Sequence, residues 1–210
     1  CTGTSRSPSN PILECVKGWP QIVFALLALA LAGAFAYSRL QGQTSSSISG
    51  TLIEAMPQAP DLALEGSDGK THRLSDWNGK VRLVFFAYTY CPDTCPLTLA
   101  ALARQYEELG EPPDLQVIMI TVDPRRDTPQ RLKTYLAPFH RSFIGLTGTP
   151  EQIARVSSGF YAGYSGSGLV QHSDEVRVLD KAGRFRAVYN QARLAKQELY
   201  HDLPQILRWP

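Results

Sequence analysis

Two cysteines at the junction of a buried strand and a helix constrain this chain more than any other feature. The segment 81–88, Val-Arg-Leu-Val-Phe-Phe-Ala-Tyr, is mostly apolar and rich in Val and aromatic residues, which is typical of a central strand. A helix is expected to begin at Pro96. It is indicated by apolar residues at helical spacing and a closing glycine: Leu99, Leu102, Tyr106, Leu109 and Gly110.

Cys91 and Cys95 therefore lie on the turn that opens this helix. Free backbone amides and the positive end of the helix dipole favour thiolate there, so we expect pKa values below the ordinary value of about 8.5. Residues four apart on a helical turn face the same way, so both sulfurs are able to reach one ion.

Length and charge restrict the class of protein. The 210 residues suffice for one domain of ordinary size plus an appendage, and the net charge is only +2. Because no basic stripe with interleaved aromatic residues is present, we predict no nucleic-acid binding. Four cysteines are too few for a disulfide scaffold, and Cys1 and Cys15 lie in a different segment from the local pair.

The N-terminal part predicts a tethered domain. After a polar tail at 1–18, the residues from Ile22 to Tyr37 are apolar, Ala, Gly or Tyr. A transmembrane anchor at 19–38 is expected, since a span needs about 17–25 apolar residues. A cleaved signal peptide is the alternative, because Ala34-Phe35-Ala36 fits a small-x-small cleavage pattern. Both place the rest of the chain outside the cytoplasm, with the bacterial periplasm expected.

The rest of the chain alternates between strand and helix patterns. A flexible linker is expected at 39–56 and a folded domain at 57–210. Strands are predicted at 61–65, 71–74, 81–88, 115–122, 144–146, 176–180 and 185–189. Further helices are predicted from the Thr-Pro pairs at 128–129 and 149–150 and near Leu194, the last ended or kinked by Pro204. This pattern predicts an α/β fold with a mixed sheet flanked by helices.

A Cys-x-x-x-Cys pair on such a turn has three interpretations. The cysteines are inert structural thiols, or a dithiol that cycles with a disulfide, or metal ligands. Two soft thiolates prefer Cu(I) or Zn²⁺, and one imidazole would complete a three-coordinate copper site. Asp93 between them is expected to cap the helix, and Asp123, Arg126 and Asp127 to brace the following loop by salt bridges, with a partner-facing role as the alternative.

Three motifs in order resemble the Sco/SenC family of copper-binding assembly proteins for cytochrome c oxidase. They are 88–96 (Tyr-Thr-Tyr-Cys-Pro-Asp-Thr-Cys-Pro), 122–129 (Val-Asp-Pro-Arg-Arg-Asp-Thr-Pro) and 171–173 (Gln-His-Ser). The likeness runs from about Pro60 to the C-terminus. It implies a thioredoxin-like domain on an N-terminal membrane helix, with one Cu(I) or Cu(II) ion bound through Cys91, Cys95 and His172.

The resemblance also sets the expected function. It implies a copper metallochaperone, not an enzyme, that helps to load the binuclear copper centre of a haem–copper oxidase, with the copper-accepting subunit as partner. A thioredoxin-like reductant and another copper chaperone are further expected partners. Gln171 departs from the Asp that many relatives carry, which bears on how the His172 imidazole is oriented. The remaining histidines (His72, His140 and His201) are expected at the surface.

One absence favours copper over redox chemistry. Thioredoxin-family oxidoreductases usually place a cis-proline before the strand that faces their cysteines, and no proline occurs between Pro150 and Pro204. The Gln-His-Ser step takes the corresponding place. Two alternatives remain: a thiol–disulfide reductase that acts on the oxidase cysteines, and a peroxiredoxin-type enzyme.

Overall fold

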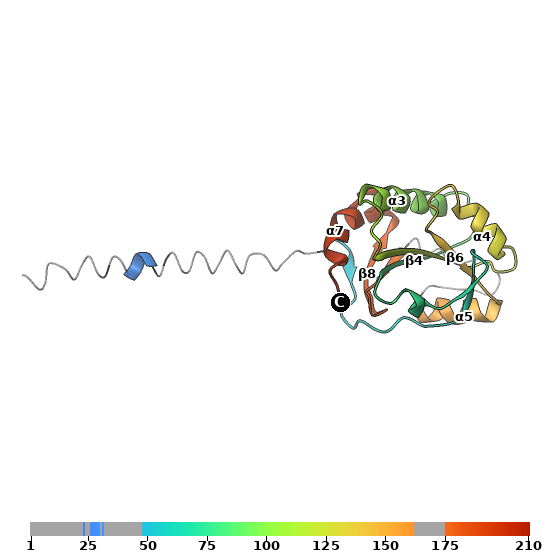
Figure 1. Ribbon diagram of the computed structural model, residues 1–210, viewed down its shortest axis with the longest axis horizontal. Helices are drawn as coiled ribbons and strands as arrows, with labels where there is room; N and C mark the ends of the chain where they lie inside the picture. The colour runs from blue at the N-terminus through green and yellow to red at the C-terminus, as the bar shows by residue number, and fades with distance from the viewer. Residues whose placement is uncertain (1–22, 24–25, 30, 32–47, 162–174) are drawn as a thin grey trace, which may run out of the picture. The chain divides into compact units, whose positions relative to one another are not determined.

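The strand that precedes the cysteines is β4 (Val81–Ala87), the core strand of a mixed sheet (Figure 1). The computed structural model describes Val23, 26–29, Leu31, 48–161 and 175–210. In this part of the chain the sheet has eight strands in the order β1-β8-β7-β4-β5-β6-β2-β3. The other strands are β1 (Thr51–Leu52), β2 (Leu64–Gly66), β3 (Thr71–His72), β5 (Leu115–Thr121), β6 (Ile144–Thr147), β7 (Glu175–Leu179) and β8 (Phe185–Asn190).

Strand directions confirm the predicted mixed α/β fold. β4 pairs in parallel with β5, and β5 with β6, whereas β7 runs antiparallel to β4 and pairs with β8 as a hairpin. On the other side, β2 pairs antiparallel with β6 and β3 closes the sheet. Among the described residues from 48 onward, the helices are η1 (Leu74–Trp77), α3 (Thr94–Glu108), α4 (Pro129–Leu136), α5 (Pro150–Gly159), α6 (Gln191–Ala195) and α7 (Glu198–Ile206).

Alternate residues of β4 fill two cores, one on each face of the sheet. Val81, Leu83 and Phe85 belong to the core formed with α3, α4, α6 and α7, whereas Val84 and Phe86 belong to the core formed with α5. Figure 1 shows α3 and α5 on opposite sides of the sheet. Because both faces of β4 are covered, every residue of the strand is buried. This burial fixes the C-terminal end of β4, and therefore the start of the cysteine turn.

Helix starts follow the predicted capping chemistry. Thr128 accepts a hydrogen bond from the amide of Arg131 (3.2 Å), and Thr149 forms a reciprocal capping box with Gln152. Pro204 is predicted to end or kink the last helix, because proline lacks the backbone N–H that the helix needs. It does not end the helix, since α7 continues to Ile206. The break lies earlier, at Gln197, whose positive φ of 60° separates α6 from α7.

The folded unit begins before Pro57. Residues Ile48–Pro210 form one compact unit, and β1 pairs with β8. The Asp202 carboxylate of α7 accepts hydrogen bonds from the amide of Ser49 (2.7 Å) and the hydroxyl of Tyr189 (2.6 Å). The predicted linker boundary is therefore too late, because the strand pairing is made by a segment with no strong strand pattern.

The predicted membrane anchor at 19–38 lies mostly outside the described residues. Of this segment, Val23, 26–29 and Leu31 are helical. Among the described residues, no helix has the length and apolar character needed to span a membrane. The anchor therefore stays a prediction.

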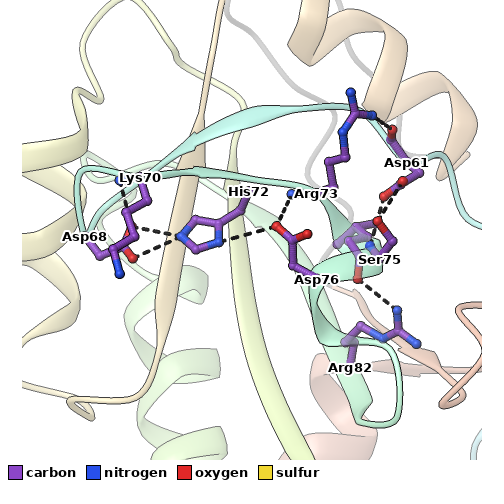
Figure 2. A network of polar contacts seen from close by, with 9 residues as sticks. Asp61, Asp68, Lys70, His72, Arg73, Ser75, Asp76 and Arg82 are labelled. Atoms are coloured by element: carbon purple, nitrogen blue, oxygen red, sulfur yellow. Dashed lines mark hydrogen bonds and ion pairs between the residues drawn. The ribbon is translucent and has the colours of Figure 1, made fainter.

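The segment before β4 is held by a polar network rather than by a long hairpin. Asp61, predicted to lie in a strand, instead accepts hydrogen bonds from the amide (2.9 Å) and hydroxyl (2.8 Å) of Ser75. Figure 2 shows this network. The His72 imidazole is hydrogen-bonded to the Asp68 carboxylate (2.9 Å), and the buried Arg82 guanidinium donates to the carbonyl of Leu74 (3.0 Å). Trp77 stacks on His72 with 5.1 Å between ring centroids and packs, partly buried, against the core.

Candidate metal centre

The structure brings Cys91 and Cys95 together at the C-terminal end of β4. The amide of Cys91 donates to the carbonyl of Tyr88 (3.1 Å), which closes a turn directly after the strand. Cys95 lies in the first turn of α3, which begins at Thr94 rather than at Pro96, and its amide donates to the Cys91 sulfur (3.4 Å). Both thiols are free and buried. The two sulfurs therefore form one dithiol site, as predicted.

The two thiols differ in acidity. Burial alone would raise the pKa of Cys91, but hydrogen bonds from the Cys95 thiol, from the Asp93 and Cys95 amides and from the Thr94 hydroxyl outweigh it, so this pKa lies below its ordinary value. For Cys95, burial and its hydrogen bond to the Cys91 sulfur raise the pKa to about 12. The expected low pKa is confirmed for Cys91 and wrong for Cys95, because Cys95 lies deeper in the core.

We expect iodoacetamide at pH 8 to label Cys91 at least about tenfold faster than Cys95, since the thiolate is the nucleophile. Access does not distinguish them, because Cys91 is 7% and Cys95 is 6% exposed. As pH rises, Cys91 labelling should reach half its maximal rate below the ordinary thiol pKa. Peptide mapping by mass spectrometry measures both rates, and in 6 M guanidinium the two should become equal. Faster labelling of Cys95 in the folded chain would contradict the assignment.

Asp127 anchors the turn that carries the cysteines. Its carboxylate is fully buried and accepts hydrogen bonds from the Thr89 amide (3.0 Å), the Thr89 hydroxyl (2.5 Å) and the Thr121 hydroxyl (2.6 Å). Thr89 lies two residues before Cys91, and Thr121 ends β5. No salt bridge involves Asp127 in the described part of the chain, so the predicted ion-pair role is wrong for this residue. Sequence reasoning missed Thr89 and Thr121, since isolated threonines carry no signal.

Replacing Asp127 with alanine is expected to lower the free energy of unfolding by about 3 kcal/mol, because buried donors lose a charged acceptor. The matched control is Asp93→Ala, which removes an exposed carboxylate from the cysteine turn and should change stability by less than about 0.5 kcal/mol. Urea unfolding of the metal-free chain measures both. Equal stability of the two variants would show that the Asp127 hydrogen bonds do not hold the turn.

Asp93 and Asp123, for which capping and salt-bridge roles are predicted, differ in their side-chain interactions. Asp93 is the residue before α3, but its side chain makes no capping hydrogen bond, so the predicted cap is wrong. Its φ and ψ of −137° and −82° differ from the extended conformation of a typical N-cap. Asp123 pairs with Arg126, which confirms that part of the predicted loop bracing.

His172, the predicted third ligand, lies outside the described residues, as do Gln171 and Ser173. Among the described residues, no group of three or more His, Cys, Asp or Glu side chains is arranged to hold a metal ion. His201 is exposed as expected. His140 is buried, contrary to expectation: its Nδ1 accepts a hydrogen bond from the Ser142 amide (3.2 Å), and its ring packs on Tyr106.

Aromatic side chains border the dithiol. Tyr88 and Tyr135 pack against the core cluster that contains both cysteines. Burial, with the nearby cysteine sulfurs, raises the pKa of both tyrosines. The buried Tyr135 hydroxyl has no hydrogen-bond partner among the described residues. The sulfurs therefore lie in an apolar setting that keeps water away and suits a soft metal ion or thiol exchange.

Comparison with known proteins places this geometry in a family. The SCO1/SenC family model matches residues 54–208. A mitochondrial SCO2 homolog from Bos taurus is 34% identical over 210 residues, covering 93% of this chain and 77% of the relative. The apo Sco1 solution structure from Thermus thermophilus superposes with a TM-score of 0.66 at 38% identity, covering 78% of this chain and 99% of that one.

A copper-bound relative has the same fold. Copper-bound ScoI from Arabidopsis thaliana superposes with a TM-score of 0.62 at 30% identity, covering 71% of this chain and 99% of that chain. The thioredoxin-like arrangement of the sheet agrees with these matches. This chain belongs to the SCO1/SenC family.

Proposed function

We propose that this chain is a copper metallochaperone that carries one copper ion on Cys91, Cys95 and His172. The ion is cargo, destined for the binuclear copper centre of a haem–copper oxidase. The domain works outside the cytoplasm, in the bacterial periplasm, on the N-terminal helix at 19–38. The observation that carries the proposal is the free Cys91–Cys95 pair, hydrogen-bonded across the β4–α3 turn.

The donor set suits this cargo. Two thiolates are soft ligands that select Cu(I), and an imidazole adds the nitrogen donor that Cu(II) prefers. The hydrogen bonds that lower the pKa of Cys91 make it the first thiolate available for an incoming ion. Cys95 must release its proton as the ion binds, so copper uptake is coupled to proton release. The Asp127 hydrogen bonds to Thr89 hold the turn in place during exchange.

Transfer follows from ligand exchange. A partner thiolate joins the copper ion, one cysteine of this chain leaves, and repetition of the step moves the ion without releasing it to water. Cys91 and Cys95 follow the C-terminal end of β4, on the turn that opens α3, and a docked partner must reach them there. No change in the oxidation state of copper is required.

The test is a Cu(I) titration of the full chain against a chromogenic competitor such as bathocuproine disulfonate. The fully reduced chain should take up a single Cu(I) ion per molecule at Cys91 and Cys95. The chain oxidised to the Cys91–Cys95 disulfide should take up none at this pair, because neither sulfur can then be a thiolate. Absence of uptake by the reduced chain would refute the proposal.

The second candidate is a thiol–disulfide reductase, favoured by the unequal pKa values of the two cysteines. The Cys91 thiolate would attack a partner disulfide, forming a mixed disulfide and releasing one partner thiolate. Cys95, after losing its proton, would attack the Cys91 sulfur and release the second. The partner gains two electrons, and a thioredoxin-like reductant must then restore the dithiol. The reduction potential of the Cys91/Cys95 couple decides whether this direction is favourable.

A further inference from the structure

A tyrosine held between two arginines lies directly beside the candidate metal centre. Tyr90 immediately precedes Cys91, and its side chain is 49% exposed. The guanidinium carbon of Arg126 lies 4.6 Å from the centroid of the Tyr90 ring, and that of Arg131 lies 4.2 Å from it. The two arginines come from different elements, the loop after β5 and the first turn of α4.

The two arginines differ in how their charge is compensated. Arg126 pairs with Asp123. The Nε of Arg131 donates to the Thr89 hydroxyl (2.9 Å), and in the described part of the chain Arg131 forms no ion pair. Its remaining guanidinium N–H groups have no hydrogen-bond acceptor among the described residues, and their planar arrangement suits bidentate binding of a carboxylate.

Helix stability does not account for Arg131. The first turn of α4 contains no acidic residue, and Arg131 lies there at the positive end of the helix dipole. A cation at this position is unfavourable for the helix itself, because its charge has the same sign as that end of the dipole. Arg131 and the dipole both place positive charge beside the cysteine turn. The buried Asp127 carboxylate, which accepts from the same Thr89 hydroxyl that Arg131 donates to, offsets part of that charge. The exposed end of the Arg131 guanidinium is the part that an external anion can reach.

One exposed apolar side chain lies close after the cysteines in the sequence. Leu97, two residues after Cys95 in the first turn of α3, is 55% exposed. Exposed tyrosine and arginine are the side chains that most often dominate the binding energy of protein interfaces. Ligand exchange requires a partner sulfur to approach Cys91, so such a partner must contact the adjacent Tyr90.

We propose that Tyr90, Leu97, Arg126 and Arg131 form the docking surface for the copper-accepting domain, and that this domain presents carboxylates around an apolar contact. The proposal rests on the proposed function and names the chemistry of its partner. A carboxylate of the acceptor binds Arg131, and an apolar side chain packs on Tyr90 and Leu97. Opposite charges then steer the encounter, while the aromatic contact fixes the distance between the two sets of sulfurs.

The experiment is stopped-flow transfer of Cu(I) from the full chain to the copper-accepting domain of the oxidase from the same genome, at several ionic strengths. Wild-type transfer should slow as salt rises, because charge steering is screened. Arg131→Glu should slow transfer at low salt by at least about tenfold and remove or invert the salt dependence. Lys133→Glu makes the same charge change at another exposed side chain of α4, two residues and therefore about 200° further around the helix. It should keep the wild-type behaviour within about twofold.

The salt dependence separates docking from damage to the copper site, because a change in copper affinity alone does not alter its slope. Tyr90→Ala should lower the transfer rate at every salt concentration while leaving the slope unchanged. Equal salt dependence of the Arg131→Glu and Lys133→Glu chains, or no salt dependence of the wild type, would overturn the docking surface. Failure of the wild-type chain to take up or pass on any copper would instead overturn the proposed function.

Discussion

Replacing Cys95 with serine is expected to lower Cu(I) affinity at least about a hundredfold. Loss of an outer-sphere partner alone typically costs 10–100-fold, and this substitution would remove one of the proposed ligand atoms. Serine keeps the shape of cysteine but offers a hard oxygen whose proton is not released near neutral pH, so it does not replace a thiolate on Cu(I). Cys91→Ser should have an effect of the same order, because linear Cu(I) coordination needs both sulfurs. Competition with bathocuproine disulfonate measures each affinity.

The control is a buried residue of the same helix whose side chain is held by a neighbouring element rather than by the cysteine turn. Thr98→Ser fits, since Thr98 is buried one turn further along α3 and its hydroxyl donates to Gln191 (2.7 Å), a bond that serine retains. This variant should bind copper as the wild type does. Circular dichroism of the metal-free chains checks that the serine variants remain folded. A Cys95→Ser chain with wild-type Cu(I) affinity would exclude the dithiol as the binding site.

The same Cys95→Ser chain tests the peroxiredoxin-type alternative. Such an enzyme needs one activated cysteine and no metal, and Cys91 has the lowered pKa that this chemistry requires. Peroxide turnover by the Cys95→Ser chain would support that alternative. We expect no turnover, because Cys91 lies in a pair built around the Cys95 amide and thiol.

Most of the fold was predictable because its strong patterns are local. The strand β4 is buried on both faces, so its apolar run is continuous, and the Thr-Pro helix starts carry their own capping chemistry. The wrong predictions concern features whose structure depends on tertiary contacts. β1 is two residues long and is held by β8 and Asp202, and the break between α6 and α7 depends on one residue with positive φ.

The candidate site was predictable in its cysteines but not in its support. The spacing of Cys91 and Cys95 on a helix start determines that their sulfurs meet, whatever the rest of the chain does. Asp127 reaches Thr89 and Thr121 only because β4 and β5 are neighbours, and the raised pKa of Cys95 depends on its depth in the core. Neither the pairing of β4 with β5 nor the burial of the Cys95 side chain can be recognised from the local sequence.

Replacing His172 with alanine is expected to separate the two oxidation states of copper. Two thiolates hold Cu(I) in a linear arrangement without a third ligand, so Cu(I) affinity should stay within about tenfold of the wild type. Cu(II) prefers further nitrogen donors, and its affinity should fall at least about a hundredfold, together with the thiolate-to-Cu(II) absorption band. Parallel titrations with Cu(I) and Cu(II) competitors measure the two affinities.

His201→Ala is the matched control, because it removes an exposed imidazole of α7 from the same domain. It should leave both affinities and the absorption band unchanged. A His172→Ala chain with wild-type Cu(II) affinity would show that another group completes the site, while the Cys91–Cys95 dithiol would still account for Cu(I). A large loss of Cu(I) affinity would mean that the imidazole is required in both states, and copper release to a partner would then have to begin with His172 rather than with a thiolate.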